Sequence, residues 1–167
     1  VLVLLISSLA AFAFAKFDFP GKNLLFSAVL ATFLLPTQLA TIPQFVLMSK
    51  IGWVGDLKAV IVPSLASSFG VFWLRQYATN SISTELLEAA RIDGAGPMKF
   101  FRDILLPLSR TNIAALFVIL FIYGWNQYLW PLLITQSNYA RPIAVGIAGF
   151  FGSDSIYWNL AMAASVV

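Results

Sequence analysis

The side chains that could carry out chemistry gather in one stretch of the chain, residues 83–107. The sequence has 10 Lys and Arg and 7 Asp and Glu residues. This stretch holds Glu85, Glu88, Arg91, Asp93, Lys99, Arg102 and Asp103. Side chains of these types bind metal ions, exchange protons with a substrate or form ion pairs with another protein. The rest of the sequence decides between these uses.

The composition argues against catalysis and metal binding. The chain has no Cys and no His, which excludes disulfides, thiolate and imidazole metal ligands and His-based catalytic dyads. Neither the phosphate-binding pattern G-x-x-x-x-G-K-[ST] nor the nucleophile pattern G-x-S-x-G occurs. No Asp or Glu lies inside an apolar segment, so proteolysis by paired acids within a membrane is not supported. We expect a chain that is not an enzyme and binds no cofactor, with a membrane enzyme as the weaker alternative.

The overall composition indicates a membrane protein. Hydrophobic residues make up 60% of the chain and charged residues 10%, whereas a soluble domain has roughly a quarter charged residues. The 15 Phe and 5 Trp residues fit a lipid-facing surface with anchors at the interfaces. The chain begins with Val1 in an apolar run that lacks a basic n-region. We therefore expect a truncated transmembrane helix there rather than a signal peptide, and a fragment of a longer polypeptide.

Apolar segments long enough to cross a bilayer, which takes about 20 residues, recur along the chain. The complete ones are 24–48, 59–79 and 111–135, and shorter ones at 1–15 and 157–167 are expected to be parts of two further spans. Pro36 and Pro43 interrupt the first complete span, which indicates a kinked helix in a bundle. The predicted fold is all-α, a polytopic transmembrane helical bundle that forms a single domain over residues 1–167.

The basic residues of the loops predict the orientation. One side of the membrane receives Lys16, Lys22, Arg75, Arg91, Lys99, Arg102 and Arg110. The other side receives Lys50, Lys58 and Arg141. Because basic residues are enriched in cytoplasmic loops, this excess places residues 83–107 in the cytoplasm.

The first half of this polar stretch predicts a short amphipathic helix. Ser83 or Thr84 can cap it, and Glu85 in the first turn suits the helix dipole. Its shared apolar face is expected to consist of Leu86, Ala89 and Ala90. Gly94 and Gly96 are expected to end it.

The second half predicts another helix that begins at Pro97, which suits a first turn. Phe101, Ile104 and Leu105 are expected to share one face. Lys99 and Asp103, four residues apart, are expected to pair on the opposite face. Residues 83–107 therefore form a predicted helix–turn–helix at the cytoplasmic surface.

Two uses of this helix pair remain open on physical grounds. The pair could rest among lipid headgroups, as amphipathic loops do, or it could dock a soluble partner. Ala89, Ala90 and Gly94 favour docking slightly, because small residues let the side chains of a partner approach the backbone.

The spacing within this stretch resembles the EAA loop of binding-protein-dependent ABC importers. Glu88-Ala89-Ala90, Gly94, Ile104 and Leu106-Pro107 meet every fixed position of the pattern E-A-A-x3-G-x9-I-x-L-P. The strings EAARIDGAGP, LRQY at 74–77 and GWNQYLWPLL at 124–133 look like the second permease subunit of the maltose-permease type. The portion 111–133 also resembles the corresponding subunit of sn-glycerol-3-phosphate importers.

The resemblance covers essentially the whole chain and implies a type I ABC importer permease fold. Such permeases have six spans, so this chain would lack the first span and most of the last. The implied location is the bacterial inner membrane. The implied partners are a second permease subunit in a heterodimer, two ATP-binding-cassette subunits and an extracytoplasmic solute-binding protein, with no nucleic acid. ATP and Mg would be used by the cassette subunits.

The same resemblance implies a coupling role for residues 83–107, through which closure of the cassettes would move the permease. The implied coupling residues are Glu88, Ala89, Ala90, Arg91, Asp93, Gly94, Ile104, Leu106 and Pro107. A membrane scaffold that docks a protein without transport is the alternative.

Polar and aromatic side chains within the apolar segments are candidates for a translocation path. These are Gln38, Asn126, Gln127, Trp125 and Tyr128, with Trp130 as a further flat ring. The amides either hydrogen-bond between helices or line a sugar path. Glycerol-phosphate permeases carry charged residues around the positions of Gln38 and Ala40, and this sequence has none there. A neutral sugar or short oligosaccharide is therefore the expected cargo, with sn-glycerol-3-phosphate as the alternative.

Overall fold

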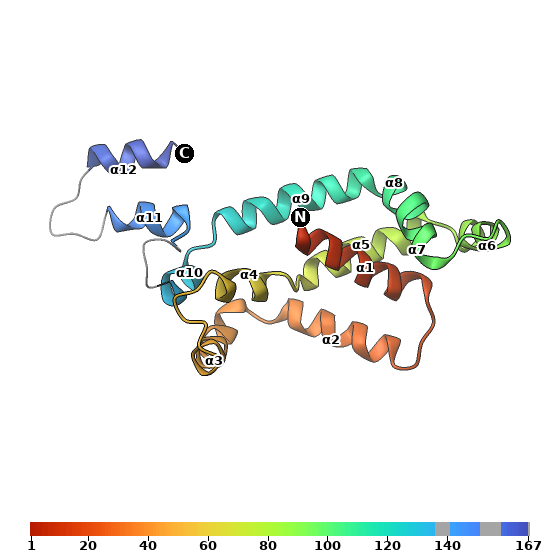
Figure 1. The fold of residues 1–167 in the computed structure, drawn as a ribbon, viewed down its shortest axis with the longest axis horizontal. Helices are drawn as coiled ribbons and strands as arrows, with labels where there is room; N and C mark the ends of the chain where they lie inside the picture. Colours follow the sequence, from red (N-terminus) through yellow and green to blue (C-terminus); the bar gives the residue numbers. More distant parts are fainter. Residues whose placement is uncertain (136–140, 151–157, 167) are drawn as a thin grey trace. The chain divides into compact units, whose positions relative to one another are not determined.

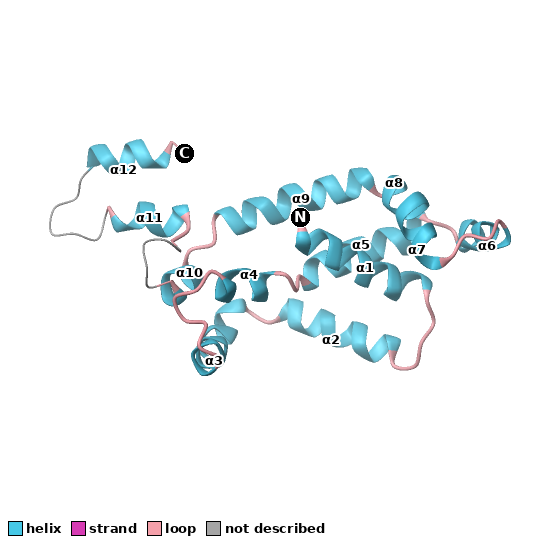
Figure 2. Cartoon of the chain, in the orientation of Figure 1, coloured by secondary structure: helices cyan, strands magenta, loops and turns pink. Residues whose placement is uncertain are grey.

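The structure is a computed structural model, and it describes residues 1–135, 141–150 and 158–166. All regular structure in these residues is helical (Figure 1 and Figure 2). The helices are α1 (Leu2–Lys16), α2 (Lys22–Leu34), α3 (Thr37–Lys50), α4 (Lys58–Ser64), α5 (Ser68–Ser81), α6 (Thr84–Ile92), α7 (Pro97–Phe100), the π-helix η1 (Phe101–Leu105), α8 (Leu106–Leu108), α9 (Arg110–Trp125), α10 (Leu129–Ile134), α11 (Ile143–Gly149) and α12 (Trp158–Ser165). The all-α prediction is confirmed for this part of the chain.

The helices fall into two compact units. Unit 1 consists of Val1–Pro36 and Ser64–Leu120, and unit 2 of Thr37–Pro63 and Phe121–Val167. Unit 1 contains the whole polar stretch 83–107, and unit 2 contains the candidate path residues. The assignment of residues 1–167 to a single domain stays a prediction.

Each of the three segments expected to span the membrane is divided between two helices. The sequence indicates the interruption at Pro36 but not the breaks in 59–79 and 111–135. The segment 24–48 divides between α2 and α3, 59–79 between α4 and α5, and 111–135 between α9 and α10. In the part of the chain that the structure describes, no one helix has the length and apolar character needed to cross a membrane. Two pairs of helices have the required length and apolar character only when the two members are combined, and each pair is bent at a break. These pairs are Lys22–Leu34 with Thr37–Lys50 and Pro97–Leu108 with Arg110–Trp125.

Particular residues cause the three breaks. Pro36 disfavours helical geometry at the residue before it, and Leu35 is extended with φ −76° and ψ 134°. The hydroxyl of Ser67 accepts a hydrogen bond from Gly70 N at 3.0 Å and thereby starts α5 as an N-cap. The side-chain amide of Asn126 donates to Ile122 O at 2.8 Å, which offers the end of α9 a local alternative to continued helix.

Close packing of α1 along α5 forms the centre of unit 1. Ala11, Leu74 and Leu116 are buried between α1, α5 and α9. At the edge of the unit the guanidinium of Arg75 lies 4.0 Å from the ring centroid of Phe26. Basic side chains near the end of a span usually extend toward the membrane–water interface. The Arg75 side chain instead makes this cation–π contact.

Unit 2 is held by a smaller cluster of Met48, Ala59, Trp130 and Ile134. The indole N–H of Trp130 donates to Ala59 O at 2.9 Å, and this bond is buried. Gly55 N donates to Ile134 O at 2.8 Å. These two bonds hold α10 against the segment around the start of α4.

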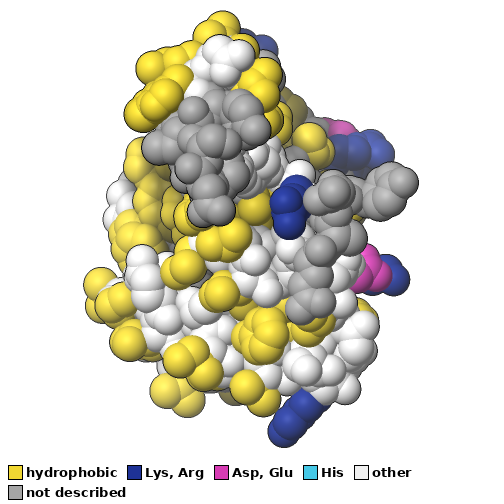
Figure 3. All heavy atoms as spheres, turned by 90° about the vertical axis from the view of Figure 1, so that its left-hand side faces the viewer, with side chains coloured by type: hydrophobic (Ala, Val, Ile, Leu, Met, Phe, Trp, Pro, Cys, Tyr) yellow, Lys and Arg dark blue, Asp and Glu magenta, His cyan; other side chains and the backbone are white. Residues whose placement is uncertain are grey.

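Large apolar side chains lie exposed on many helices, and they cover much of the face drawn in Figure 3, with few charged side chains among them. Leu24, Leu39 and Ile42 are 76%, 68% and 76% exposed. Exposure of many large apolar side chains indicates contact with lipid or with another protein chain.

The contact between α1 and α5 depends on the absence of a side chain at Gly70. A Cβ atom at Gly70 would lie 2.7 Å from Ser7 Oγ and 3.2 Å from Ser7 Cβ. The Ser7 hydroxyl is buried and has no hydrogen-bond partner, so its position is fixed by packing and not by a bond. This approach is the small-residue packing that lets membrane helices come close together.

We predict that Gly70→Ala lowers the free energy of unfolding by about 1–3 kcal/mol through overpacking, and that the swap Ser7→Gly/Gly70→Ala recovers most of this loss. Thermal unfolding of the detergent-purified protein measures both. Gly146→Ala is the matched control, because no atom lies within 4 Å of a Cβ at that helical glycine. Equal effects of Gly70→Ala and Gly146→Ala would contradict the packing account.

Candidate functional site

The ends of the first helix of the polar stretch lie where the sequence predicts them. Ser83 Oγ accepts a hydrogen bond from Leu86 N at 3.3 Å and caps α6, and Glu85 lies in its first turn. Gly94, with φ +77°, supplies the left-handed turn after α6. Pro97 begins α7, as expected.

The buried face of α6 differs from the predicted one. Leu87 and Ala90 are buried, whereas Leu86 and Ala89 are exposed. The reason is that Leu87 and Ala90 pack against α1, α5 and the segment 100–105. Nothing in the local periodicity favoured this pair over Leu86 with Ala89 or Ala90.

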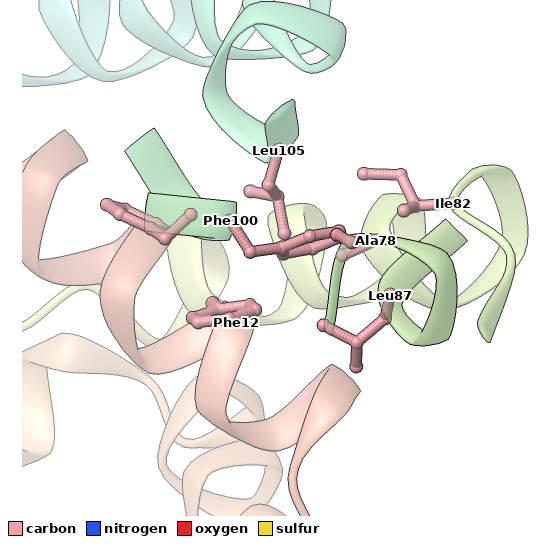
Figure 4. Close-up of a cluster of buried hydrophobic side chains, with 8 residues drawn as sticks. Phe12, Ala78, Ile82, Leu87, Phe100 and Leu105 are labelled. Atoms are coloured by element: carbon pink, nitrogen blue, oxygen red, sulfur yellow. The ribbon is translucent and has the colours of Figure 1, made fainter. Parts of the chain in front are cut away.

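A cluster of buried side chains, which we call the anchor cluster, holds the polar stretch to the apolar helices (Figure 4). It consists of Phe12, Ala78, Ile82, Leu87, Ala90, Phe100, Phe101 and Leu105. The ring of Phe12 on α1 stacks on Phe100 with centroids 6.0 Å apart and lies 5.4 Å from Phe101. Phe100 is fully buried. The expected apolar face of Phe101, Ile104 and Leu105 is confirmed, with Ile104 packed at its margin.

A polar contact adds to this anchor. The ammonium of Lys16, the last residue of α1, donates a hydrogen bond to Ile82 O, just before α6. The positive charge of Lys16 also lies near the end of α5 (Ser68–Ser81), where the carbonyl ends of a helix attract cations. α1 is therefore linked to the chain at the end of α5 by a hydrogen bond and to α6 by apolar packing.

The predicted ion pair between Lys99 and Asp103 is not formed. Asp103 instead accepts a hydrogen bond from Arg102 Nε at 2.6 Å. The chain is π-helical over 101–105, so a residue four positions on no longer stacks above its partner as it does in an α-helix. The Arg102 hydrogen bond is the largest cause of the lowered pKa of Asp103, with the charges of Arg102 and Lys99 as smaller contributions. Both side chains are exposed, so the pair contributes little to stability.

The predicted coupling residues divide into an exposed and a packed group. Those exposed to solvent are Glu88, Ala89, Arg91, Asp93, Gly94 and Pro107. Ala90 belongs to the anchor cluster, and Ile104 and Leu106 pack against its margin. The exposed group thus presents small and charged side chains around the turn at Gly94, where a Cβ would meet no atom within 4 Å.

Two exposed apolar residues of this turn were missed by the sequence reasoning. Ile92 is 86% exposed and Met98 is 65% exposed. In the sequence Ile92 lies between Arg91 and Asp93, and Met98 lies between Pro97 and Lys99. An interpretation based on the shared apolar face of each helix leaves out apolar residues at such positions. We call residues Glu88–Met98 the loop tip.

The candidate path residues are brought together only in part. Trp125 and Asn126 line a surface hollow of about 310 Å³ together with Phe121 and Ile122. Tyr128 is exposed, Gln127 is half-buried, and neither lines this hollow. Gln38 is exposed in the first turn of α3 and also lies outside it.

Two details refine the roles of these side chains. The side-chain amide of Asn126 donates to Ile122 O at the end of the same helix, and its role in a translocation path stays a prediction. Trp130 is buried and bonded to Ala59 O, so the suggestion that its ring faces a cargo is wrong, and the ring is part of the core of unit 2.

The sequence matches, over residues 4–167, the family described as the binding-protein-dependent transport system inner membrane component. The chain belongs to this family. The resemblance seen in the EAA pattern is thereby confirmed, and the family description assigns the chain to an inner membrane component of a transport system.

Relatives and a solved structure agree with this assignment. The chain is 46% identical over 165 residues to the sn-glycerol-3-phosphate transport system permease protein UgpE of Salmonella typhi. It is 43% identical over 166 residues to the protein of that name from Rhizobium meliloti. These matches cover 97% and 98% of this chain and 58% of each relative, so the chain spans less than two thirds of their length.

The fold matches a chain of a bacterial ABC transporter involved in the import of the acidic polysaccharide alginate, with a TM-score of 0.84. The match covers 99% of this chain and 58% of that one at 22% sequence identity. It shows that the fold is that of an ABC importer permease, as predicted. The number of membrane crossings and the cytoplasmic side of residues 83–107 stay predictions.

Proposed function

We propose that the chain forms part of the translocation pathway of an ATP-driven importer and receives mechanical work through residues 83–107. The observation that carries this proposal is the combination of an exposed loop tip with a buried anchor cluster on one short helix pair. A loop that only rested among lipid headgroups would need no such attachment to α1 and α5.

The anchor cluster supports transmission of force. Leu87 and Ala90 on α6 pack in one cluster with Phe12 on α1 and Ala78 on α5. Packed interiors are dense and transmit displacement instead of absorbing it. A movement of α6 would therefore be passed to two apolar helices of unit 1.

The loop tip supports docking to a protein. Ile92 and Met98 expose apolar side chains on either side of Gly94, and the charged residues Glu88, Arg91 and Asp93 surround them. An apolar centre with a polar rim is the usual anatomy of a protein interface. The proposed occupant is an ATP-binding-cassette subunit, which would bind ATP and Mg itself.

The remaining partners follow from the proposed mechanism. A second permease subunit would complete the pathway, a second cassette subunit would complete the pair that closes on ATP, and an extracytoplasmic binding protein would deliver the cargo. The two-state element is the permease pair, which would rock between inward-open and outward-open states.

We predict that Gly94→Asp abolishes ATP-linked uptake while the protein still inserts into the membrane. A side chain at φ +77° is strained, which costs about 1–2 kcal/mol, and the new charge would lie at the centre of the loop tip. Uptake by proteoliposomes that contain the whole transporter measures the effect.

Gly52→Asp is the matched control for this substitution. Gly52 also has a positive φ, of +71°, and a Cβ there also meets no atom within 4 Å, but it lies in the loop after α3. We expect Gly52→Asp to retain uptake. Unchanged uptake in Gly94→Asp would refute the coupling role, and ATP hydrolysis without uptake by the native transporter would favour the scaffold alternative.

For the cargo we propose a neutral sugar or short oligosaccharide. The hollow beside Trp125 is lined by aromatic, aliphatic and amide side chains and by no charged residue. Flat aromatic faces bind the apolar face of a sugar ring, and few polar groups orient it. The relatives named as sn-glycerol-3-phosphate permeases favour that phosphate ester as the second candidate.

The cargo proposal predicts which ligand stimulates ATP hydrolysis by the whole transporter with its binding protein. We expect neutral mono- and oligosaccharides to include a stimulating ligand and sn-glycerol-3-phosphate to have no effect. Trp125→Ala is expected to raise the half-saturating sugar concentration about tenfold, which corresponds to about 1.4 kcal/mol, whereas Tyr123→Ala, outside the hollow, is expected to leave it unchanged. Stimulation by the phosphate ester alone would overturn the choice of cargo.

A further inference from the structure

The segment that joins the loop tip to α9 has an unusual local geometry. Residues Phe101–Leu105 form a π-helical turn in which Leu106 N donates to Phe101 O, five residues back. Pro107 follows this turn by two residues. In an α-helix the N–H at position 107 would donate to Asp103 O, but proline has no N–H. The helical stretch Pro97–Leu108, which contains the π turn, is followed after Ser109 by α9 (Arg110–Trp125). The axes of these two stretches are bent by 76° relative to each other. π turns of this kind occur mostly at functional positions in helices.

A π turn holds one residue more than an α turn. If this turn closed to α geometry, the chain after it would rotate by about 100°, the angle that one residue occupies in an α-helix. Leu108 and Ser109 lie in the chain after the turn, where such a rotation would change the surroundings of each residue. The contacts of these two residues therefore show what holds the π register.

One contact of the segment after the turn favours the π register. The phenol of Tyr77 on α5 donates a hydrogen bond to Leu108 O at 2.9 Å. It ties the last residue of α8 to a helix that is itself packed on α1. A rotation of about 100° would carry the Leu108 carbonyl away from this donor.

One contact disfavours the π register. Ser109 is buried, and its hydroxyl has no hydrogen-bond partner. It lines a cavity of about 10 Å³ whose other walls include Ala11, Leu74 and Leu105. An unpaired buried hydroxyl carries a desolvation penalty comparable in size to the gain of one hydrogen bond. The same rotation would take this hydroxyl out of the cavity.

We propose that residues 101–109 form a register switch, in which a π turn latched by Tyr77 exchanges with an α turn and so redirects α9 relative to the loop tip. The hydrogen bond from Tyr77 favours the first register, and the unpaired hydroxyl of Ser109 disfavours it. A pair of alternative packings is what a small force at a docking surface can convert into a discrete change. The proposal deepens the proposed coupling function and rests on it for its biological role, but its geometry is testable separately.

The test is a distance measurement in the assembled transporter in lipid nanodiscs. The chain has no Cys, so Glu85→Cys on α6 and Ala115→Cys on α9, both exposed, carry nitroxide labels at unique positions when the partner subunits are Cys-free. Pulsed electron resonance then gives the distance distribution with and without ATP. We expect two populations whose ratio changes with ATP.

Two substitutions are expected to move this ratio in opposite directions. Tyr77→Phe removes the latch and is expected to shift the ratio about fivefold toward the second population. Ser109→Ala removes the unpaired hydroxyl and is expected to shift it by a similar factor toward the first. Tyr123→Phe and Ser81→Ala, both at exposed positions, are matched controls that should leave the ratio unchanged.

The outcomes separate the switch from the coupling function. Opposite shifts in the two variants support the switch, and they do so even if Gly94→Asp leaves uptake intact and the coupling role falls. A single population, or shifts in the same direction in both variants, overturns the switch even if ATP-linked uptake is observed.

Discussion

The packing of the Phe12 ring against Phe100 and Phe101 is the interaction on which the rest of this structure depends. It joins the most polar part of the chain to one of the most apolar helices. Aromatic pairs of this geometry contribute about 0.5–1.5 kcal/mol beyond the area they bury. With Leu87, Ala90 and Leu105 in the same cluster, they make the helix pair a part of unit 1 and not an appendage. Both the proposed coupling and the proposed register switch need this attachment, since a detached loop could move without moving a membrane helix.

The sequence predicted the polar stretch well because its signals are local. The Ser83 cap, the turn at Gly94 and the start at Pro97 each depend on the backbone chemistry of one or two residues. The choice of Leu87 over Leu86 as the buried residue depends on where α1 and α5 lie, and a nine-residue helix has too few turns for its periodicity to decide this. The pairing of Asp103 with Arg102 instead of Lys99 depends on the π turn. Pro107 was the single local feature of the sequence that could have indicated this turn.

The long apolar segments show the reverse pattern. Their apolar character is plain in the sequence, and Pro36 indicates the interruption of the first segment. For the other two, length alone predicted continuous helices where the structure has breaks at Ser67 and Asn126. Broken helices in such a chain require partners for the freed backbone groups, so they belong where protein surrounds them or a path is lined. The break at Asn126 lies beside the hollow at Trp125, which is where the proposal places the cargo. The burial of Trp130 could not be predicted from the sequence, because its partner Ala59 lies 71 residues away.

The most direct test of the central claim compares two adjacent leucines of α6. Leu87 is buried in the anchor cluster, and Leu86 is 37% exposed. The quantity to measure is the number of cargo molecules imported for each ATP hydrolysed by the reconstituted transporter. The account predicts that Leu87→Ala, which leaves a cavity in the anchor cluster, lowers this ratio several-fold while ATP hydrolysis continues, and that Leu86→Ala leaves it near the native value. An unchanged ratio in Leu87→Ala would contradict the claim that the anchor cluster carries motion from the loop tip into the membrane helices.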